Sequence, residues 1–89
     1  MFTEKPRVRN RPFYQEIRRG KPFFLPLEAE AIPPATFQWF KNGYPLPEQR
    51  GAVLVLEDVD LSAAGTYSCE VSNVAGRVLW LEATLHVTD

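Results

Sequence analysis

The most informative stretch of the chain is a run of alternating residue types, Thr66-Tyr67-Ser68-Cys69-Glu70-Val71-Ser72. Its apolar members fall on every second position, with polar residues between them. Successive side chains of a β-strand point to opposite faces, so the pattern predicts a strand with one buried and one solvated face. A strand of this kind is typical of an antiparallel sheet.

The segments around this strand follow the same periodicity. The turn 73–76 has Asn and Gly where a hairpin tolerates positive φ, and it predicts a hairpin to a final strand. Apolar residues share a phase within the last predicted strand, at Leu79, Leu81, Ala83, Leu85 and Val87. Upstream, one phase is shared by Phe23, Leu25, Leu27 and Ala29, another strand has Phe37 and Trp39 on its inner face, and Leu54 and Leu56 lead to Val59. We therefore predict an all-β fold of two antiparallel sheets packed as a sandwich.

The size of the chain fits one domain. It has 89 residues, of which 45% are hydrophobic. We expect a single domain over residues 1–89, with its core within about 6–88. The first ten residues carry charges where a signal peptide has its apolar run, and no stretch approaches the ~20 apolar residues of a membrane span. We expect neither an export signal nor an anchor in this chain.

The spacing of three residues identifies the type of sandwich. Trp39 stands thirty residues before Cys69, and Tyr67 stands two residues before that cysteine. Together with Trp-Phe-Lys-Asn-Gly at 39–43 and Ala-Gly-Thr-Tyr-Ser-Cys at 64–69, this spacing resembles the intermediate set of immunoglobulin domains, found in titin-like muscle proteins, cytoskeletal scaffolds and neural adhesion molecules.

The resemblance covers about residues 6–87 and implies several features of the fold. It implies Greek-key connections, a tyrosine corner at Tyr67, and a chain that is one module of a longer protein. The core residues that it implies are Leu27, Trp39, Leu56, Tyr67 and Cys69.

The departures from the family pattern carry their own predictions. Leu27 stands where the family places its first cysteine, so the inter-sheet disulfide is expected to be absent. A leucine there can fill the space beside Trp39, although the lost cross-link typically costs ~2 to 4 kcal/mol. Ala63 stands where the family carries an aspartate that pairs with an arginine, so that ion pair is expected to be absent too.

Two further departures concern strands. Only fourteen residues separate Trp39 from Leu54, an interval shorter than is usual in the family, so the middle edge strand should shrink to a turn or be missing. Pro26 lies within an expected central strand, where it lacks a ladder donor. A bulge or a gap in pairing is expected there.

The cysteine count favours a reducing compartment. Cys69 is the single cysteine, and none of the three asparagines begins an Asn-x-Ser/Thr sequon. Disulfides are rare in the cytosol. We expect a cytoplasmic location in the cytoskeleton or sarcomere, with an extracellular location as the alternative.

No residue pattern supports catalysis, a cofactor or a metal site. The chain has one histidine and one cysteine, and neither has a partner in a known catalytic or ligand spacing. His86 falls on the outer face of its strand, and Cys69 is expected to be an inert buried thiol. We predict that the protein is not an enzyme and holds neither cofactor nor metal.

Basic residues gather at the start of the chain. Lys5, Arg7, Arg9, Arg11, Arg18, Arg19 and Lys21 precede residue 22, against Glu4 and Glu16. Their arginines are candidates for meeting an acidic protein surface, whereas solvated edge-strand charge is the favoured alternative. Aromatic residues do not interleave as in a nucleic-acid platform, and neither a nucleic acid nor a membrane is expected as the partner.

Side-chain phase suggests a second candidate surface. If the leucines of the last strand face inward, then Val78 and Trp80 face outward, on the same side as Phe40. These three residues would form an aromatic patch for a protein partner. The alternatives are a bulge that turns Trp80 inward, or cover by a basic side chain.

Taken together, the sequence predicts a non-catalytic module for protein–protein interaction or mechanical spacing in an intracellular cytoskeletal or sarcomeric protein. The partners would be cytoskeletal proteins or neighbouring immunoglobulin domains, and the isolated domain is expected to be monomeric. The alternatives are an extracellular adhesion or receptor domain and a docking domain of an intracellular signalling scaffold, and the fold alone does not separate them.

Overall fold

The computed structural model describes residues 2–11 and 13–89, with the side chains of residues 81 and 82 excepted. Within these residues, nine strands and one short 3-10 turn follow one another. They are β1 (Glu4–Val8), β2 (Phe13–Arg18), β3 (Phe23–Pro26), β4 (Ala29–Ile32), β5 (Thr36–Lys41), β6 (Tyr44–Leu46), β7 (Val53–Leu56), η1 (Leu61–Ala63), β8 (Gly65–Asn73) and β9 (Gly76–Thr88).

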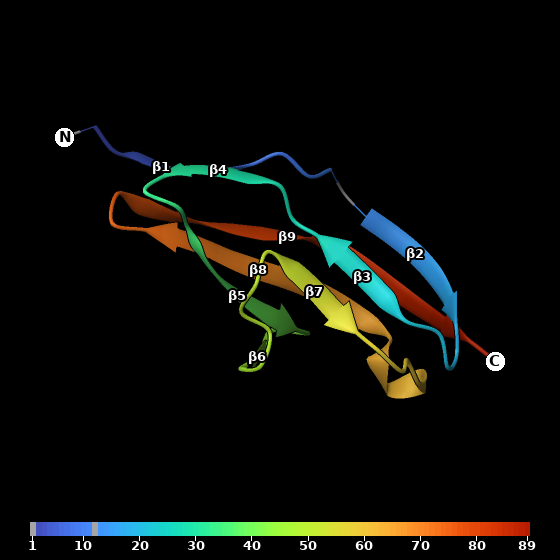
Figure 1. Cartoon of the computed structure of the whole chain (residues 1–89). Helices are drawn as coiled ribbons and strands as arrows, with labels where there is room; N and C mark the ends of the chain where they lie inside the picture. The colour runs from blue at the N-terminus through green and yellow to red at the C-terminus, as the bar shows by residue number, and fades with distance from the viewer. Residues whose placement is uncertain (1, 12) are drawn as a thin grey trace.

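The strands form two layers. One layer is a five-stranded sheet in the order β2-β9-β8-β5-β6, antiparallel except for the parallel pair β2–β9. The other consists of two antiparallel pairs, β1–β4 and β3–β7. Figure 1 shows β3 and β4 following one another along the same layer, with β8 and β9 passing behind them. The predicted two-sheet sandwich without an inter-sheet disulfide is confirmed.

Apolar side chains from both layers meet in a single core. Its buried members are Phe23, Leu25, Leu27, Trp39, Leu54, Val59, Tyr67, Cys69, Val71, Trp80, Ala83, Leu85 and Val87. Four of the five core residues implied by the family pattern are among them. The fifth, Leu56, is partly buried and packs against the cluster.

The strand that contains Pro26 is interrupted, but its pairing with β7 has no bulge. β3 ends at Pro26 and β4 begins at Ala29, whereas the β3–β7 register runs regularly to Pro26 opposite Val53. The amide of the next residue, Leu27, donates to the carbonyl of Ala52 at 2.7 Å. Because hydrogen-bonded and non-hydrogen-bonded pairs alternate in an antiparallel ladder, Pro26 occupies a position that needs no donor toward β7.

The expected loss of the middle edge strand also occurs. Residues 47–52, all of them described, form turns and bends between β6 and β7 without a strand. Backbone and side-chain hydrogen bonds hold this connection: the indole N–H of Trp39 donates to the Gly51 carbonyl at 2.8 Å, and the Trp39 amide donates to the Gln49 carbonyl at 3.4 Å. The connection therefore stays attached to the five-stranded sheet.

Candidate interaction surfaces

The residues at the centre of the core replace the family's disulfide by packing. Cys69 lies opposite Trp39 in the β5–β8 register, and both side chains are fully buried. Leu27 is 5% exposed and belongs to the same cluster. Burial raises the pKa of the Cys69 thiol to about 12, which leaves it protonated at neutral pH. A buried, protonated thiol has none of the features of a reactive cysteine.

The tyrosine corner predicted at Tyr67 is present. Its phenol donates a hydrogen bond to the carbonyl of Ala63 in η1, at 2.6 Å. Burial raises the pKa of Tyr67 to about 12. Ala63 stands where the family has an aspartate, and its main-chain carbonyl accepts this hydrogen bond.

The phase predicted for the last strand is broken by a bulge. Tyr67 pairs with Ala83 and Cys69 pairs with Trp80, so β8 advances by two residues while β9 advances by three. One extra residue in β9 reverses the faces on its N-terminal side. Leu79, expected inside, is 53% exposed, and Trp80 is buried. The inward prediction for Leu79 is wrong, and that for Leu81 falls on a side chain outside the described ones.

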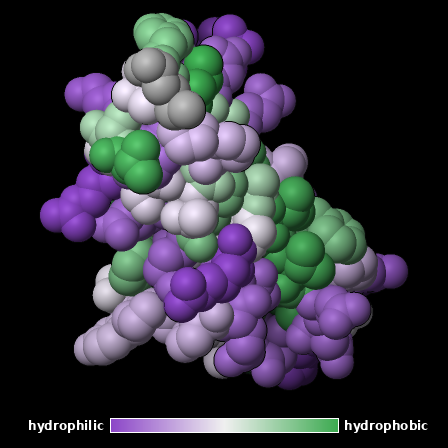
Figure 2. Space-filling model, turned by 60° about the vertical axis from the view of Figure 1, so that its left-hand side comes forward, coloured by the Kyte–Doolittle hydropathy of each residue, from purple (hydrophilic) through white to green (hydrophobic). Residues whose placement is uncertain are grey.

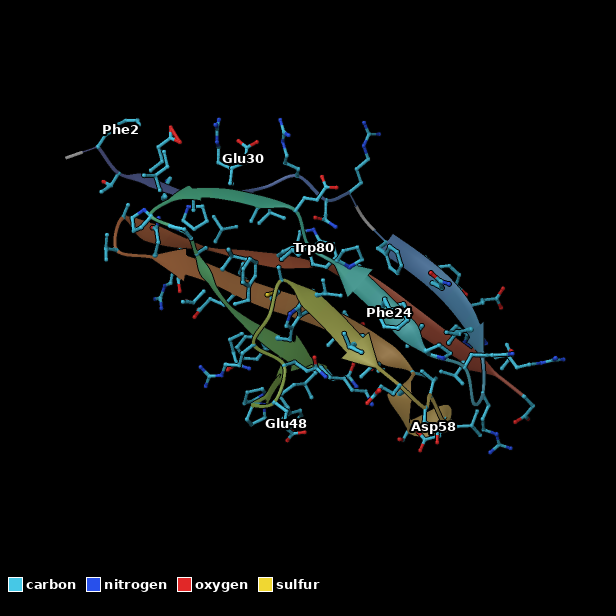
Figure 3. All side chains as sticks on the ribbon, in the orientation of Figure 1. Phe2, Phe24, Glu30, Glu48, Asp58 and Trp80 are labelled. Atoms are coloured by element: carbon cyan, nitrogen blue, oxygen red, sulfur yellow. The ribbon has the colours of Figure 1, made fainter. Side chains whose placement is uncertain are left out.

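Trp80 therefore lies in the core, as in the alternative in which a bulge turns its side chain inward. Its ring meets Trp39 edge-to-face, with centroids 6.4 Å apart and planes at 84°. Figure 3 shows Trp80 between β9 and the layer of β3 and β4. Trp80 is buried, and Val78 lies opposite the buried Val71, on the core side of the sheet. The predicted patch of Phe40, Val78 and Trp80 therefore does not form. Phe40 and Leu79 line a shallow hollow on the outer face of the five-stranded sheet, with Gly43, Ser68 and Glu70.

The basic residues at the start of the chain are not a free positive arm. Arg7 and Arg9 lie within 3.7 and 3.2 Å of Glu30 on the paired strand β4, and Arg19 lies 3.1 Å from Asp89. These pairs are exposed to solvent and contribute little to stability. Figure 3 shows the side chain of Glu30 pointing away from the sandwich. Arg11 and Arg18 are exposed, which leaves a solvated edge of mixed charge.

An apolar face on the other layer was missed by the sequence reasoning. Phe24 is 56% exposed and lies opposite Val55, and the neighbouring Val53 is 40% exposed. Hydrophobic side chains gather on the right-hand side of Figure 2. The rotation between the two views brings the face that carries β3 and β7 in Figure 1 to this side. The signal available was the run Phe23-Phe24-Leu25, where one aromatic residue must face outward when its neighbours face inward.

The described residues contain neither a cluster of metal-ligating side chains nor a membrane-spanning helix. Within residues 2–11 and 13–89, no group of three or more His, Cys, Asp or Glu side chains comes together as a metal site would require. In the same part of the chain, no helix has the length and apolarity to cross a membrane. His86 lies exposed on β9.

A sandwich with a tryptophan on β5, a tyrosine corner at the start of β8 and a parallel β2–β9 pair defines an immunoglobulin-like domain. The family model described as "Immunoglobulin domain" matches residues 5–73. The chain belongs to this family, and the predicted resemblance to domains of titin-like proteins is confirmed.

The curated relatives are long proteins that share one segment with this chain. Mouse hemicentin-1 is 31% identical over 84 residues, which cover 79% of this chain and 2% of the hemicentin. The human cell adhesion molecule DSCAML1 is 34% identical, with 83% and 4% covered. The muscle M-line assembly protein unc-89 of Caenorhabditis elegans is 32% identical, with 70% and 1% covered. This chain thus spans a few per cent of the length of each relative.

Among solved structures, titin domain M4 superimposes with a TM-score of 0.85 at 24% identity, covering 99% of this chain and 100% of the titin domain. A chain from a complex of titin M10 with an obscurin-like 1 immunoglobulin domain matches with a TM-score of 0.85 at 25% identity. The match covers 98% of the present chain and 96% of the chain in the complex. Immunoglobulin modules similar to this chain thus occur in a cell adhesion molecule, in a muscle M-line assembly protein and in titin.

Proposed function

We propose that the chain is a non-catalytic module of an intracellular cytoskeletal or sarcomeric protein, acting as a spacer or as a docking surface for another protein. One observation carries the proposal: Leu27 and the single cysteine, Cys69, are buried in the same core as Trp39. A core closed by apolar packing does not need an oxidising compartment. The likeness to the muscle protein unc-89 supports the same reading.

The shape of the molecule suits a spacer in a tandem array. The backbone extends over 52 × 24 × 19 Å, and Figure 1 shows the two ends of the chain at opposite ends of the long axis. Neighbouring domains joined at both ends would follow one another in a line. We propose that the whole chain is one such domain within a longer protein.

The partners would be neighbouring immunoglobulin domains or other cytoskeletal proteins. Solved structures of titin immunoglobulin domains with telethonin and with obscurin-like 1 support this class of partner. For the contact surface, we propose the outer face of the five-stranded sheet around Phe40, where Leu79 takes the position first assigned to Trp80. The exposed Arg11 and Arg18 would add charge at the edge formed by the first strands.

An extracellular adhesion domain is the second candidate. It is favoured by the similarity to the cell adhesion molecule DSCAML1. A domain of this class would tolerate the loss of its disulfide only if packing supplied the missing stability.

Protease protection on intact cells separates the two candidates. An antibody against this chain reports whether the parent protein survives trypsin added outside the cells, before and after detergent permeabilisation. The proposal predicts survival until the cells are permeabilised. Digestion on intact cells would instead establish the extracellular candidate.

A further inference from the structure

Among the described residues, β7 pairs with a strand on one side only, that of β3, and a side chain occupies the other side. The Gln49 amide nitrogen donates to the Val55 carbonyl at 2.8 Å, and the Val55 amide donates to the Gln49 side-chain oxygen at 3.3 Å. Two residues of an antiparallel pair exchange the same two hydrogen bonds. The side chain of Gln49 therefore imitates one residue of a neighbouring strand.

The backbone around Gln49 holds this side chain in place. The Gln49 amide donates to the Leu46 carbonyl at 3.0 Å, and its carbonyl accepts from Trp39 on β5. Gly51, two residues on, accepts from the Trp39 indole. Gln49 is thus fixed to the five-stranded sheet through its main chain and to β7 through its side chain, so that it links the two layers.

The edge that Gln49 covers has the features of a strand-pairing site. Backbone groups point alternately to the two sides of a strand, so Val53 presents its N–H and C=O to the same side as Val55. The outer face beside this edge is apolar, with Phe24 and Val53 exposed. An exposed, hydrophobic edge strand is a template for pairing with another chain.

Charge and spacing indicate which chain fits this edge. Arg50 and Asp58 each stand four residues from Leu54, on opposite sides of it. In an antiparallel pair of two β7 strands centred on Leu54, Val53 of one copy faces Val55 of the other. Arg50 and Asp58 lie just beyond the two ends of β7, and an extension of the paired strands to these residues would bring Arg50 opposite Asp58. Figure 3 shows Asp58 beyond the C-terminal end of β7. A second copy of this chain therefore offers the edge hydrogen bonds, apolar contacts and opposite charges.

We propose that Gln49 is a side-chain plug that keeps the β7 edge closed, and that the edge, once opened, pairs antiparallel with β7 of a second copy. The plug takes over the protective role of the strand that this chain lacks. The proposal does not depend on the compartment or partners proposed above.

The test compares the parent chain with Gln49→Ala and Gln49→Met, which remove the amide; the methionine variant keeps the length of the side chain. Gln38→Ala is the matched control: the Gln38 side-chain amide is also partly buried, but it donates to the carbonyls of Trp39 and Leu46 and not to β7. The molar mass of each is measured by light scattering over a wide range of concentrations, and the amide exchange of Val55 by NMR.

We expect the parent and Gln38→Ala to remain monomeric. Both Gln49 variants should form dimers, and in the monomer at low concentration the Val55 amide should exchange roughly fivefold to tenfold faster. Adding Val53→Lys to a Gln49 variant should restore the monomer, since a charged edge discourages pairing. Gln49 variants that stay monomeric at all concentrations would overturn the proposal, and so would a dimer that Val53→Lys fails to dissociate.

Discussion

At the scale of single residues, Tyr67 links the core to the turn before β8. Its ring is buried, and its hydroxyl reaches the carbonyl of Ala63. Tyr67→Phe keeps the ring but leaves that carbonyl without its partner. We expect the free energy of unfolding to fall by about 1 kcal/mol. Urea denaturation measures it, with Tyr44→Phe as the control, because Tyr44 is 76% exposed.

The two buried ionisable side chains, Cys69 and Tyr67, predict that the folded chain loses stability at alkaline pH. Burial raises their pKa values from 9.0 and 10.0 to about 12. Each group is then protonated in the folded chain at pH values where it ionises in the unfolded chain. The stability they support is fully present below pH 9 and is lost as the pH rises toward 12.

Denaturation curves at a series of pH values check this expectation. The contribution of these two groups to the free energy of unfolding should be constant up to pH 9 and then decline. Cys69→Val removes one of them, so its curve should decline less steeply between pH 9 and 12. Equal slopes for the variant and the parent would show that the thiol contributes nothing.

At the scale of elements, the bulge in β9 decides which aromatic residue the core receives. Trp80 is buried against Trp39, whereas its neighbour Leu79 is exposed. Trp80→Ala should lower the free energy of unfolding by about 3 to 5 kcal/mol. Leu79→Ala should change it by less than about 0.5 kcal/mol. Chemical denaturation of the two variants compares them, and the opposite ranking would mean that β9 has no bulge.

The strands could be predicted because two signals are visible in the order of the residues itself: the alternation of apolar and polar residues, and the spacing of Trp39, Tyr67 and Cys69. The sequence could not locate the bulge in β9, because a single extra residue reverses the facing of side chains without a signal in the periodicity. The turn 73–76 fixes the start of the hairpin alone. For this reason Leu79 was expected inside, and the candidate patch included Trp80.

The β3–β7 pair was only partly predictable, for a different reason. The shortened interval before Leu54 predicted that a strand is missing. It could not show that the Gln49 side chain bonds to Val55, because this contact depends on how the turn 47–52 folds back. For the first strands, the sequence left open a surface for an acidic partner or solvated edge charge. It could not show that Glu30 lies beside Arg7 and Arg9, because that contact depends on the register between β1 and β4.

At the scale of the whole molecule, stability depends on packing between two layers with no covalent link between them. Leu27 occupies the site where the family pattern places a cysteine, and it is 5% exposed. Leu27→Ala should lower the free energy of unfolding by about 2 to 5 kcal/mol. Leu61→Ala is the control, because Leu61 is 51% exposed. Equal effects in urea denaturation would show that Leu27 does not hold the layers together.

The central claim is that this immunoglobulin domain closes its core without a disulfide. Its most direct test is the thermal midpoint of the purified chain with and without a reducing agent, together with its mass and its count of free thiols. We predict the same midpoint in both conditions, a monomer, and one thiol that reacts only after unfolding. A midpoint that falls on reduction, or a reducible dimer through Cys69, would contradict the claim.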